Sequence, residues 1–216
     1  MKHKKIKQLG IQSFYVVGGG LCIVILFVVF LINYGRYWNS DYNTLKRKYP
    51  IIREDYVYEL MNTVFIESNS AITDSLELTK IICFAHVHSS TLREVIEAIE
   101  DSIASNQDRQ YLLDQLDKTV YLWDNQRLNN NWLLTPNDLN QISRNDTTDY
   151  WQEYRKKFGT SGKLGFSKPV FNKSKQIAIV ERSIRGDWLM GRGDIIICRK
   201  VNGQWKIIKE ENLWIN

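Results

Sequence analysis

The chain has 216 residues, of which 44% are hydrophobic and 25% charged, and its formal net charge is +5. This length suffices for one well-buried domain and a short additional segment. Residues 1–36 contain five Lys or Arg and no acid, so they carry the whole positive excess. The high isoelectric point therefore does not indicate nucleic-acid binding, and we expect no nucleic-acid partner.

An uncharged run of 19 residues predicts a transmembrane helix. It extends from Phe14 through Val24 to Ile32 and is rich in Val, Ile, Leu and Phe. At 1.5 Å per residue, a helix of this length spans about 28 Å, close to the hydrocarbon thickness of a bilayer. A buried core helix and a cleaved signal peptide are the alternatives, but residues 33–35 make a poor cleavage site. We expect the anchor to be retained in the lipid bilayer.

The charges beside this run predict the orientation of the chain. Four lysines precede the run, whereas Arg36 is the single basic residue between the run and Lys46. The positive-inside rule then keeps the N-terminus cytoplasmic and exports the C-terminal part. The expected layout is a cytoplasmic basic tail (1–13), a transmembrane helix (14–33), a juxtamembrane stalk (34–50) and an extracytoplasmic α+β domain (51–216).

The exported part is neutral overall but divided in charge. Residues 37–150 carry 10 basic and 18 acidic side chains, a net charge of −8, and residues 151–216 carry 14 basic and 6 acidic ones, a net charge of +8. An acidic half packed against a basic half is the simpler explanation, and a site for a polyanion is the alternative. For Cys83 and Cys198 we favour two buried thiols, although export would permit a disulfide between them.

Apolar spacing predicts a mainly helical region over residues 51–158. Residues 76–88 fit either a helix or a strand, and their spacing slightly favours a helix. Thr91–Glu94 matches a capping box, and Asp108 is suited to cap the next helix, whose inner face would extend to Trp123. Thr135-Pro136 predicts a helix start with proline at the first position, and a last helix begins near Asp149. The expected buried faces include Val57, Leu60, Met61, Val64, Phe65, Leu92, Ile96, Leu112, Trp151, Tyr154 and Phe158.

From Gly159 the pattern changes to short, partly alternating segments that predict strands. These segments are 163–171, 176–185, 194–200 and 204–209. Asn202-Gly203 predicts a type I′ hairpin turn, because both residues tolerate positive φ. The predicted fold is α+β: an N-terminal transmembrane helix, then a helical region (51–158) packed on a C-terminal four-stranded antiparallel sheet (159–216).

His86 and His88 are the candidate metal ligands. On a strand, alternation would place both rings on one face, whereas on a helix they would diverge. A third ligand would be a carboxylate such as Glu94 or Glu97, and nothing in the sequence marks it. Ordinary half-exposed histidines are the simpler interpretation, and a metal-dependent hydrolase is the alternative.

The glycine-rich segment Gly186–Gly193 predicts a flexible hairpin loop. It lacks the Lys-Ser/Thr of a phosphate-binding loop, so Trp188, Met190 and Arg192 would either cap the core or form a binding tip. Arg192 also begins an Arg-Gly-Asp tripeptide, which recurs by chance too often to indicate integrin binding. The chain has no G-x-S-x-G motif. The sequence therefore predicts no catalytic residue and no cofactor.

Four short segments follow one another within residues 147–216. They are Trp151–Tyr154, Phe166–Asn172, Ala178–Val180 and Asn202–Ile207. This pattern resembles the C-terminal β-regions of uncharacterised bacterial secreted and membrane-anchored proteins, which implies a bacterial envelope setting. More loosely, an anchor followed by helices and a curved sheet is similar to NTF2-like envelope domains, including single-pass subunits of secretion machines.

These observations predict a non-enzymatic, single-pass envelope protein that binds a protein or polymer partner. One alternative is the metal-dependent hydrolase with His86 and His88, and another is an accessory subunit of secretion or conjugation machinery. A third places the basic segment 151–216 on anionic lipid or cell-wall polymer, and it predicts salt-sensitive binding.

Overall fold

The computed structural model describes residues 41–67, 80–85, 87–129, 133–143, 149–159, 162–187 and 190–215. The chain forms two units, residues 1–44 and 45–216. Of the first unit only residues 41–44 are described, and they are helical. The transmembrane helix expected over 14–33 lies outside the described residues. Among those that are described, no helix has the length and hydrophobicity needed to cross a bilayer.

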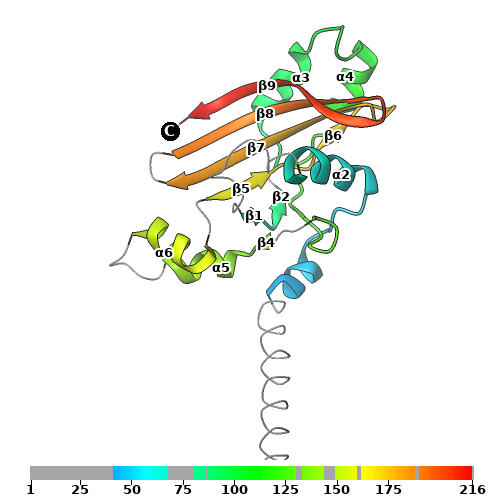
Figure 1. Ribbon diagram of the computed structural model, residues 1–216. Helices are drawn as coiled ribbons and strands as arrows, with labels where there is room; N and C mark the ends of the chain where they lie inside the picture. The colour runs from blue at the N-terminus through cyan, green and yellow to red at the C-terminus, as the bar shows by residue number, and fades with distance from the viewer. Residues whose placement is uncertain are drawn as a thin grey trace, which may run out of the picture. The chain divides into compact units, whose positions relative to one another are not determined.

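A seven-stranded mixed sheet forms the centre of the second unit (Figure 1). Its strand order is β4-β1-β5-β7-β8-β9, and β6 pairs with β7 next to β5. The β4-β1-β5 part is parallel, and the β5-β7-β8-β9 part is antiparallel. The strands are β1 Lys80–Ile82, β4 Leu133–Leu134, β5 Lys163–Phe166, β6 Val170–Phe171, β7 Ile177–Asp187, β8 Met190–Val201 and β9 Gln204–Ile215; β2 Phe84–Ala85 and β3 Tyr121–Leu122 form a separate two-stranded sheet.

The α+β class is confirmed, but the predicted four-stranded antiparallel sheet is wrong. The antiparallel meander is present, yet the region expected to be helical adds β1 and β4 in parallel. Residues 80–82 and 84–85 are strands rather than the helix that the spacing slightly favoured. β1 pairs on both sides and buries Ile81, so tertiary pairing and the branched Ile81-Ile82 outweigh the helical spacing.

The three C-terminal strands are longer than predicted. Asn202 and Gly203 have φ of 53° and 80°, so the hairpin turn with two positive φ angles is confirmed. The flexible loop expected over Gly186–Gly193 is wrong, because β7 continues through Asp187 and β8 begins at Met190. Most of that segment pairs in the ladder between these two strands.

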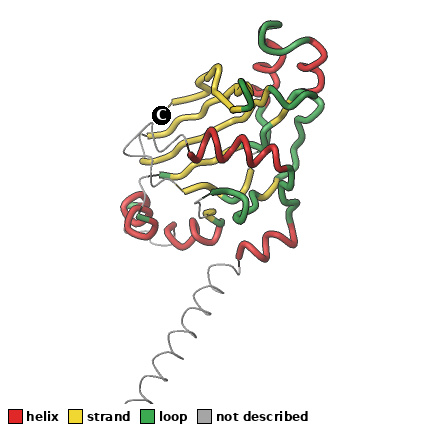
Figure 2. The backbone as a smooth tube through the Cα atoms, turned by 45° about the vertical axis from the view of Figure 1, so that its right-hand side comes forward, coloured by secondary structure: helices red, strands yellow, loops and turns green. Residues whose placement is uncertain are grey.

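Helices cover both faces of the sheet (Figure 2). Along β7, Ala178 and Val180 point into a core with α2 and η1, which cross one face. Ile177 and Ile179 point into a second core with α3 and α4 on the other face. A third cluster joins α5 and α6 to Leu134. The helices are α2 Asp55–Leu60, η1 Met61–Glu67, α3 Ser90–Ala98, α4 Asn106–Leu113, α5 Pro136–Ser143 and α6 Tyr150–Phe158.

The predictions that rested on local helix signals were the most reliable ones made from the sequence. The buried face from Val57 to Phe65 is confirmed in α2 and η1. The starts of α5 at Pro136 and of α6 after Asp149 are confirmed, and Asp149 accepts hydrogen bonds from two backbone N–H groups of α6.

Two predicted caps are wrong by two or three residues. Ser89, not Thr91, caps α3, because its hydroxyl accepts from the Leu92 N–H. Ser105, not Asp108, caps α4 in the same manner. The predicted extension of α4 to Trp123 is also wrong, since α4 ends at Leu113 and the fully buried Trp123 lies beyond β3.

Cys83 and Cys198 are free, buried thiols, as favoured from the sequence. Burial raises the pKa of each thiol from its ordinary value of 9.0 to about 12. We therefore expect neither thiol to react with a disulfide reagent at pH 8 while the protein is folded, and both to react after unfolding.

The raised pKa also gives stability a pH dependence. The folded thiols retain protons that the unfolded chain releases above about pH 9, so stability is lost as pH rises. Between pH 9 and 10 the loss should be about 1 kcal/mol per thiol, measured by urea unfolding. Replacing both cysteines with alanine should remove that part of the dependence. Rapid labelling of Cys83 or Cys198 in the folded protein at pH 8 would contradict the expectation.

Candidate functional site

Three cationic residues lie opposite one another on three neighbouring strands, and we call them the cationic row. The register pairs Lys80 of β1 with Lys163 of β5, and Lys163 with Arg185 of β7. Directly opposite residues point to the same face of a sheet, and like charges placed so are destabilising. Burial lowers the pKa of Lys80. The like charges of Lys163 and Arg185, directly opposite each other on β5 and β7, therefore disfavour folding.

A pocket of about 190 Å³ opens beside the cationic row. Its lining consists of Ile82, Lys163, Ser183 and Arg185. Ile82 is two residues after Lys80 and Ser183 is two residues before Arg185, so strand alternation brings all four lining side chains to one face. The pocket combines two positive charges, a hydroxyl group and an apolar wall. Its volume is below the range of about 300–1,000 Å³ for drug-sized ligands, so it suits a small group.

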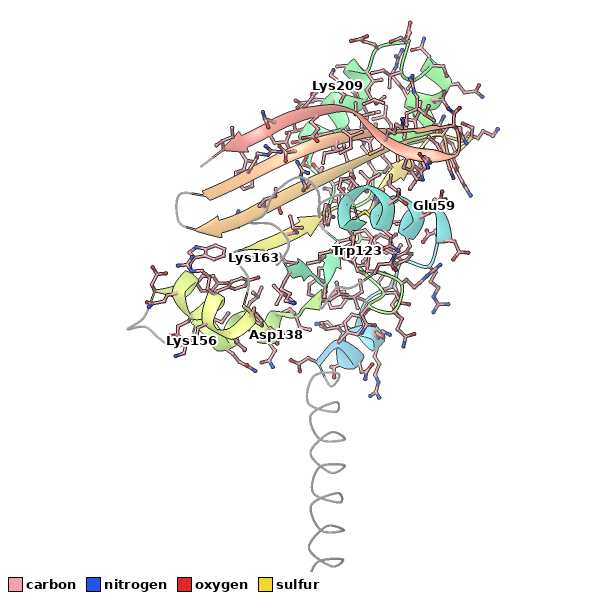
Figure 3. All side chains as sticks on the ribbon, viewed as in Figure 1. Glu59, Trp123, Asp138, Lys156, Lys163 and Lys209 are labelled. Atoms are coloured by element: carbon pink, nitrogen blue, oxygen red, sulfur yellow. The ribbon has the colours of Figure 1, made fainter. Side chains whose placement is uncertain are left out.

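Helix α6 positions the lysine of the pocket. The Lys163 ammonium donates to the Tyr150 hydroxyl oxygen at 3.1 Å and lies 5.1 and 5.4 Å from the ring centroids of Tyr150 and Trp151. The Tyr154 hydroxyl donates to the Gly162 carbonyl at 2.9 Å, which fixes the start of β5 against α6. Figure 3 shows Lys163 on the side of the sheet where α6 lies. Aromatic contacts hold the ammonium without neutralising it.

A tryptophan from β9 lies beside the arginine of the pocket. The Arg185 guanidinium carbon is 5.4 Å from the centroid of the Trp214 ring. That ring lies against Gly193, where an added Cβ would be 2.1 Å from the indole Nε1, so a larger residue at this position would displace the ring. Within the part of the chain that the structure describes, neither Lys163 nor Arg185 forms an ion pair with a carboxylate. No carboxylate among the described residues therefore neutralises the positive charge of the pocket.

The predicted metal ligands are only partly described. His86 lies outside the described residues. His88 uses both ring nitrogens: Nε2 lies 2.8 Å from the Lys168 carbonyl oxygen, and Nδ1 accepts from the Asp117 N–H at 3.3 Å. A metal would have to displace one of these bonds. Among the described residues, no group of three or more His, Cys, Asp or Glu is placed to hold a metal. The hydrolase hypothesis stays a prediction.

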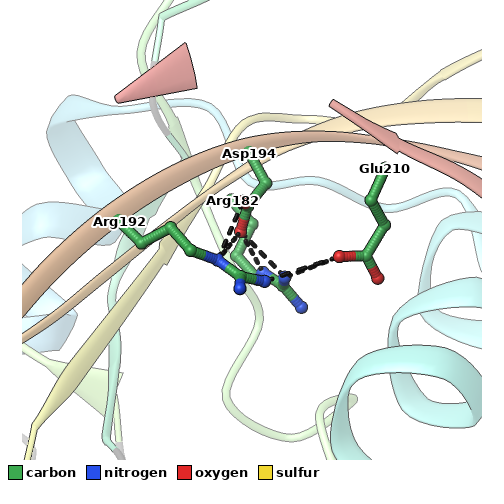
Figure 4. Close-up of polar contacts among 4 residues, drawn as sticks. All are labelled: Arg182, Arg192, Asp194 and Glu210. Atoms are coloured by element: carbon green, nitrogen blue, oxygen red, sulfur yellow. Dashed lines mark hydrogen bonds and ion pairs between the residues drawn. The ribbon is translucent and has the colours of Figure 1, made fainter. Parts of the chain in front are cut away.

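Of the three residues in the predicted binding tip, the structure places only the side chain of Arg192. Trp188 lies outside the described residues, and the side chain of Met190, where β8 begins, is likewise not described. Arg192 pairs with Ile184, so it points to the face opposite to Arg185. There it joins a four-residue ion cluster formed by Arg182, Arg192, Asp194 and Glu210 (Figure 4).

The division of charge between the halves has a structural counterpart. Glu54 pairs with Lys168 at 2.8 Å, and Glu59 pairs with Lys200, so acids of the first half contact bases of the second. Burial alone would raise the pKa of Glu54, but the Lys168 hydrogen bond and backbone N–H donors lower it. This supports the interpretation of an acidic half packed on a basic half. Lys163 and Arg185 belong to that basic half, and these two pairs do not include them.

Sequence reasoning missed the pocket because its residues meet only through strand register. The +8 charge of residues 151–216 was the only signal, and it did not distinguish Lys163 or Arg185 from twelve other bases. Comparison with protein-family models, curated proteins and solved structures finds no match for this chain.

Proposed function

We propose that this protein is a membrane-anchored, non-enzymatic binding module that holds an anionic group in the pocket between β1, β5 and β7. The observation that carries the proposal is the directly opposite pair Lys163 and Arg185 at the wall of a pocket. An anion between them converts repulsion into two charge-assisted hydrogen bonds. Because the ligand binds only the folded state, it also stabilises the fold.

The partner belongs to the cell envelope in this proposal. The uncharged run from Phe14 to Ile32 and the four lysines before it support an anchor with the domain outside the cytoplasm. An accessory role in a secretion or conjugation machine is one function of this kind that we propose.

The anchor is tested by fractionation. Deleting residues 14–33 should move the protein from the membrane to the soluble fraction, and Val24→Arg should weaken insertion, because a central arginine costs about 2.5–3.5 kcal/mol. Val24→Leu is the matched control and should stay in the membrane. A reporter fused after Asn216 should be active only outside the cytoplasm. A cytoplasmic reporter, or an intact chain in the soluble fraction, would contradict the anchor.

The pocket is tested with the purified full chain in detergent and two anionic polymers, polyphosphate and polyglutamate. We expect binding that weakens as salt rises from 50 to 300 mM, because charged groups near solvent are screened. Lys163→Ala and Arg185→Ala should each weaken it by about tenfold or more, the loss of one charge-assisted hydrogen bond. Lys173→Ala removes the same charge from the exposed turn between β6 and β7 and should have little effect. Equal losses in all three variants would contradict the proposal.

A further inference from the structure

We infer that the anionic group in this pocket is a doubly charged phosphate, carried as a monoester on a small hydroxylated molecule. The inference rests on the proposed function, because it names the ligand class of the same site. It excludes singly charged groups, such as carboxylates and phosphodiesters, as the best ligands.

The charge of the pocket favours a dianion. Lys163 and Arg185 contribute two positive charges, and in the described chain no carboxylate pairs with either. A phosphate monoester carries about −1.5 to −2 at pH 7 and balances this charge. A carboxylate or a phosphodiester carries a single negative charge, so part of the repulsion across the β5–β7 pair would remain.

The donors of the pocket also match a tetrahedral group. Arg185 offers a planar fork of N–H donors, Lys163 a compact ammonium, and Ser183 a hydroxyl group. These donors come from two strands and suit the three terminal oxygens of a monoester. A carboxylate has only two oxygens, which lie in one plane, so the same donors would have to share them.

The size and the walls of the pocket limit the rest of the ligand. A volume of about 190 Å³ is several times the roughly 30 Å³ share of one water in the liquid, so it holds a phosphate and a few more atoms. Ile82 offers an apolar wall, and the half-buried Trp214 lies beside Arg185. A short polyol or a single sugar unit matches these surroundings in size.

Titration calorimetry on the detergent-purified full chain tests the inference with four probes at pH 5 and pH 7.5. The probes are glycerol phosphate as a monoester, dimethyl phosphate as a diester, acetate and sulfate. At pH 7.5 the monoester should bind about tenfold more tightly than the diester or acetate. Its affinity should fall about tenfold at pH 5, because the second phosphate pKa is about 6 and most of the ligand is then singly charged. Sulfate stays doubly charged, so it should bind equally at both pH values and controls for titration of protein groups.

Variants locate the binding and separate the two proposals. Lys163→Gln and Arg185→Gln should each weaken monoester binding by about tenfold or more, and Lys173→Gln should not, with circular dichroism confirming that each variant is folded. Equal affinity for monoester, diester and acetate, lost in the two pocket variants, would overturn the dianion inference and leave the proposed function standing. A monoester affinity that does not change with pH would overturn it likewise. If no probe binds through Lys163 and Arg185, the proposed function itself fails.

Discussion

Replacing Asp194 with asparagine should lower the free energy of unfolding by about 3–5 kcal/mol. Asp194 is fully buried, and its Oδ2 accepts hydrogen bonds from Arg182 Nε and Nη2 at 3.1 and 2.8 Å and from Arg192 Nε at 2.9 Å. The substitution leaves the nearly buried Arg182 with the Glu210 carboxylate alone, at 3.3 Å and 38% exposed. Urea unfolding of the full chain, followed by far-ultraviolet circular dichroism, measures the loss.

A matched control distinguishes burial from ion pairing as such. Asp101 pairs with Arg109 at 2.7 Å, but its side chain is 81% exposed. Asp101→Asn should therefore cost less than about 1 kcal/mol, because water screens the exposed carboxylate of this pair. Removing both buried partners by Arg182→Met and Asp194→Leu should cost less than Asp194→Asn alone, since no unpaired charge remains between them. Similar losses in the two single Asp→Asn variants would contradict the role assigned to the cluster.

The arginines on the two faces of β7 have different neighbours, and this contrast supports the candidate site. Arg182 points to one face and lies directly opposite Asp194, which neutralises it. Arg185, three residues later, points to the other face and lies directly opposite Lys163. A pair of like charges opposite each other lowers stability, whereas the ion cluster on the other face is internally balanced. Among the described residues, the two cations of the pocket are therefore not paired with a carboxylate, whereas those of the ion cluster are.

The sequence predicted the helices that carry local signals. Val57 and Phe65 lie on the buried face of α2 and η1 because apolar spacing alone specifies that face. The start of α5 was predicted because proline and a polar cap act within a few residues. Ser89 displaced the expected cap at Thr91 because its hydroxyl also contacts the buried Glu181, a partner 92 residues away. That contact has no local signal.

The sheet was only half predicted for a related reason. β7, β8 and β9 have 11 or 12 residues each and are rich in branched apolar side chains, so strands can be recognised there from the sequence. β1 and β4 have three and two residues, and no periodicity can be recognised over such lengths. Their strand conformation depends on parallel pairing with partners far along the chain. The cationic row was missed for the same reason, because Lys80 and Lys163 become neighbours only through that pairing.

Helix α6 should couple the stability of the third core cluster to ligand affinity. Tyr154 is fully buried, and its ring packs against Trp151 at 5.4 Å and Phe158 at 5.0 Å. Tyr154→Ala should lower the free energy of unfolding by about 3–5 kcal/mol, the usual cost of removing a large buried aromatic side chain. It should also weaken anion binding, because α6 carries the tyrosine and tryptophan that hold Lys163.

The conservative variant tests whether packing or the hydroxyl group is responsible. Tyr154→Phe keeps the ring and removes only the 2.9 Å bond to the Gly162 carbonyl, so it should cost about 1 kcal/mol and leave affinity nearly unchanged. The two measurements are urea unfolding and calorimetric titration of the same anionic probe at a temperature where both variants are folded. Unchanged affinity in folded Tyr154→Ala would show that β5 holds Lys163 in place without α6. A loss of affinity in Tyr154→Phe equal to that in Tyr154→Ala would instead assign the effect to the hydrogen bond.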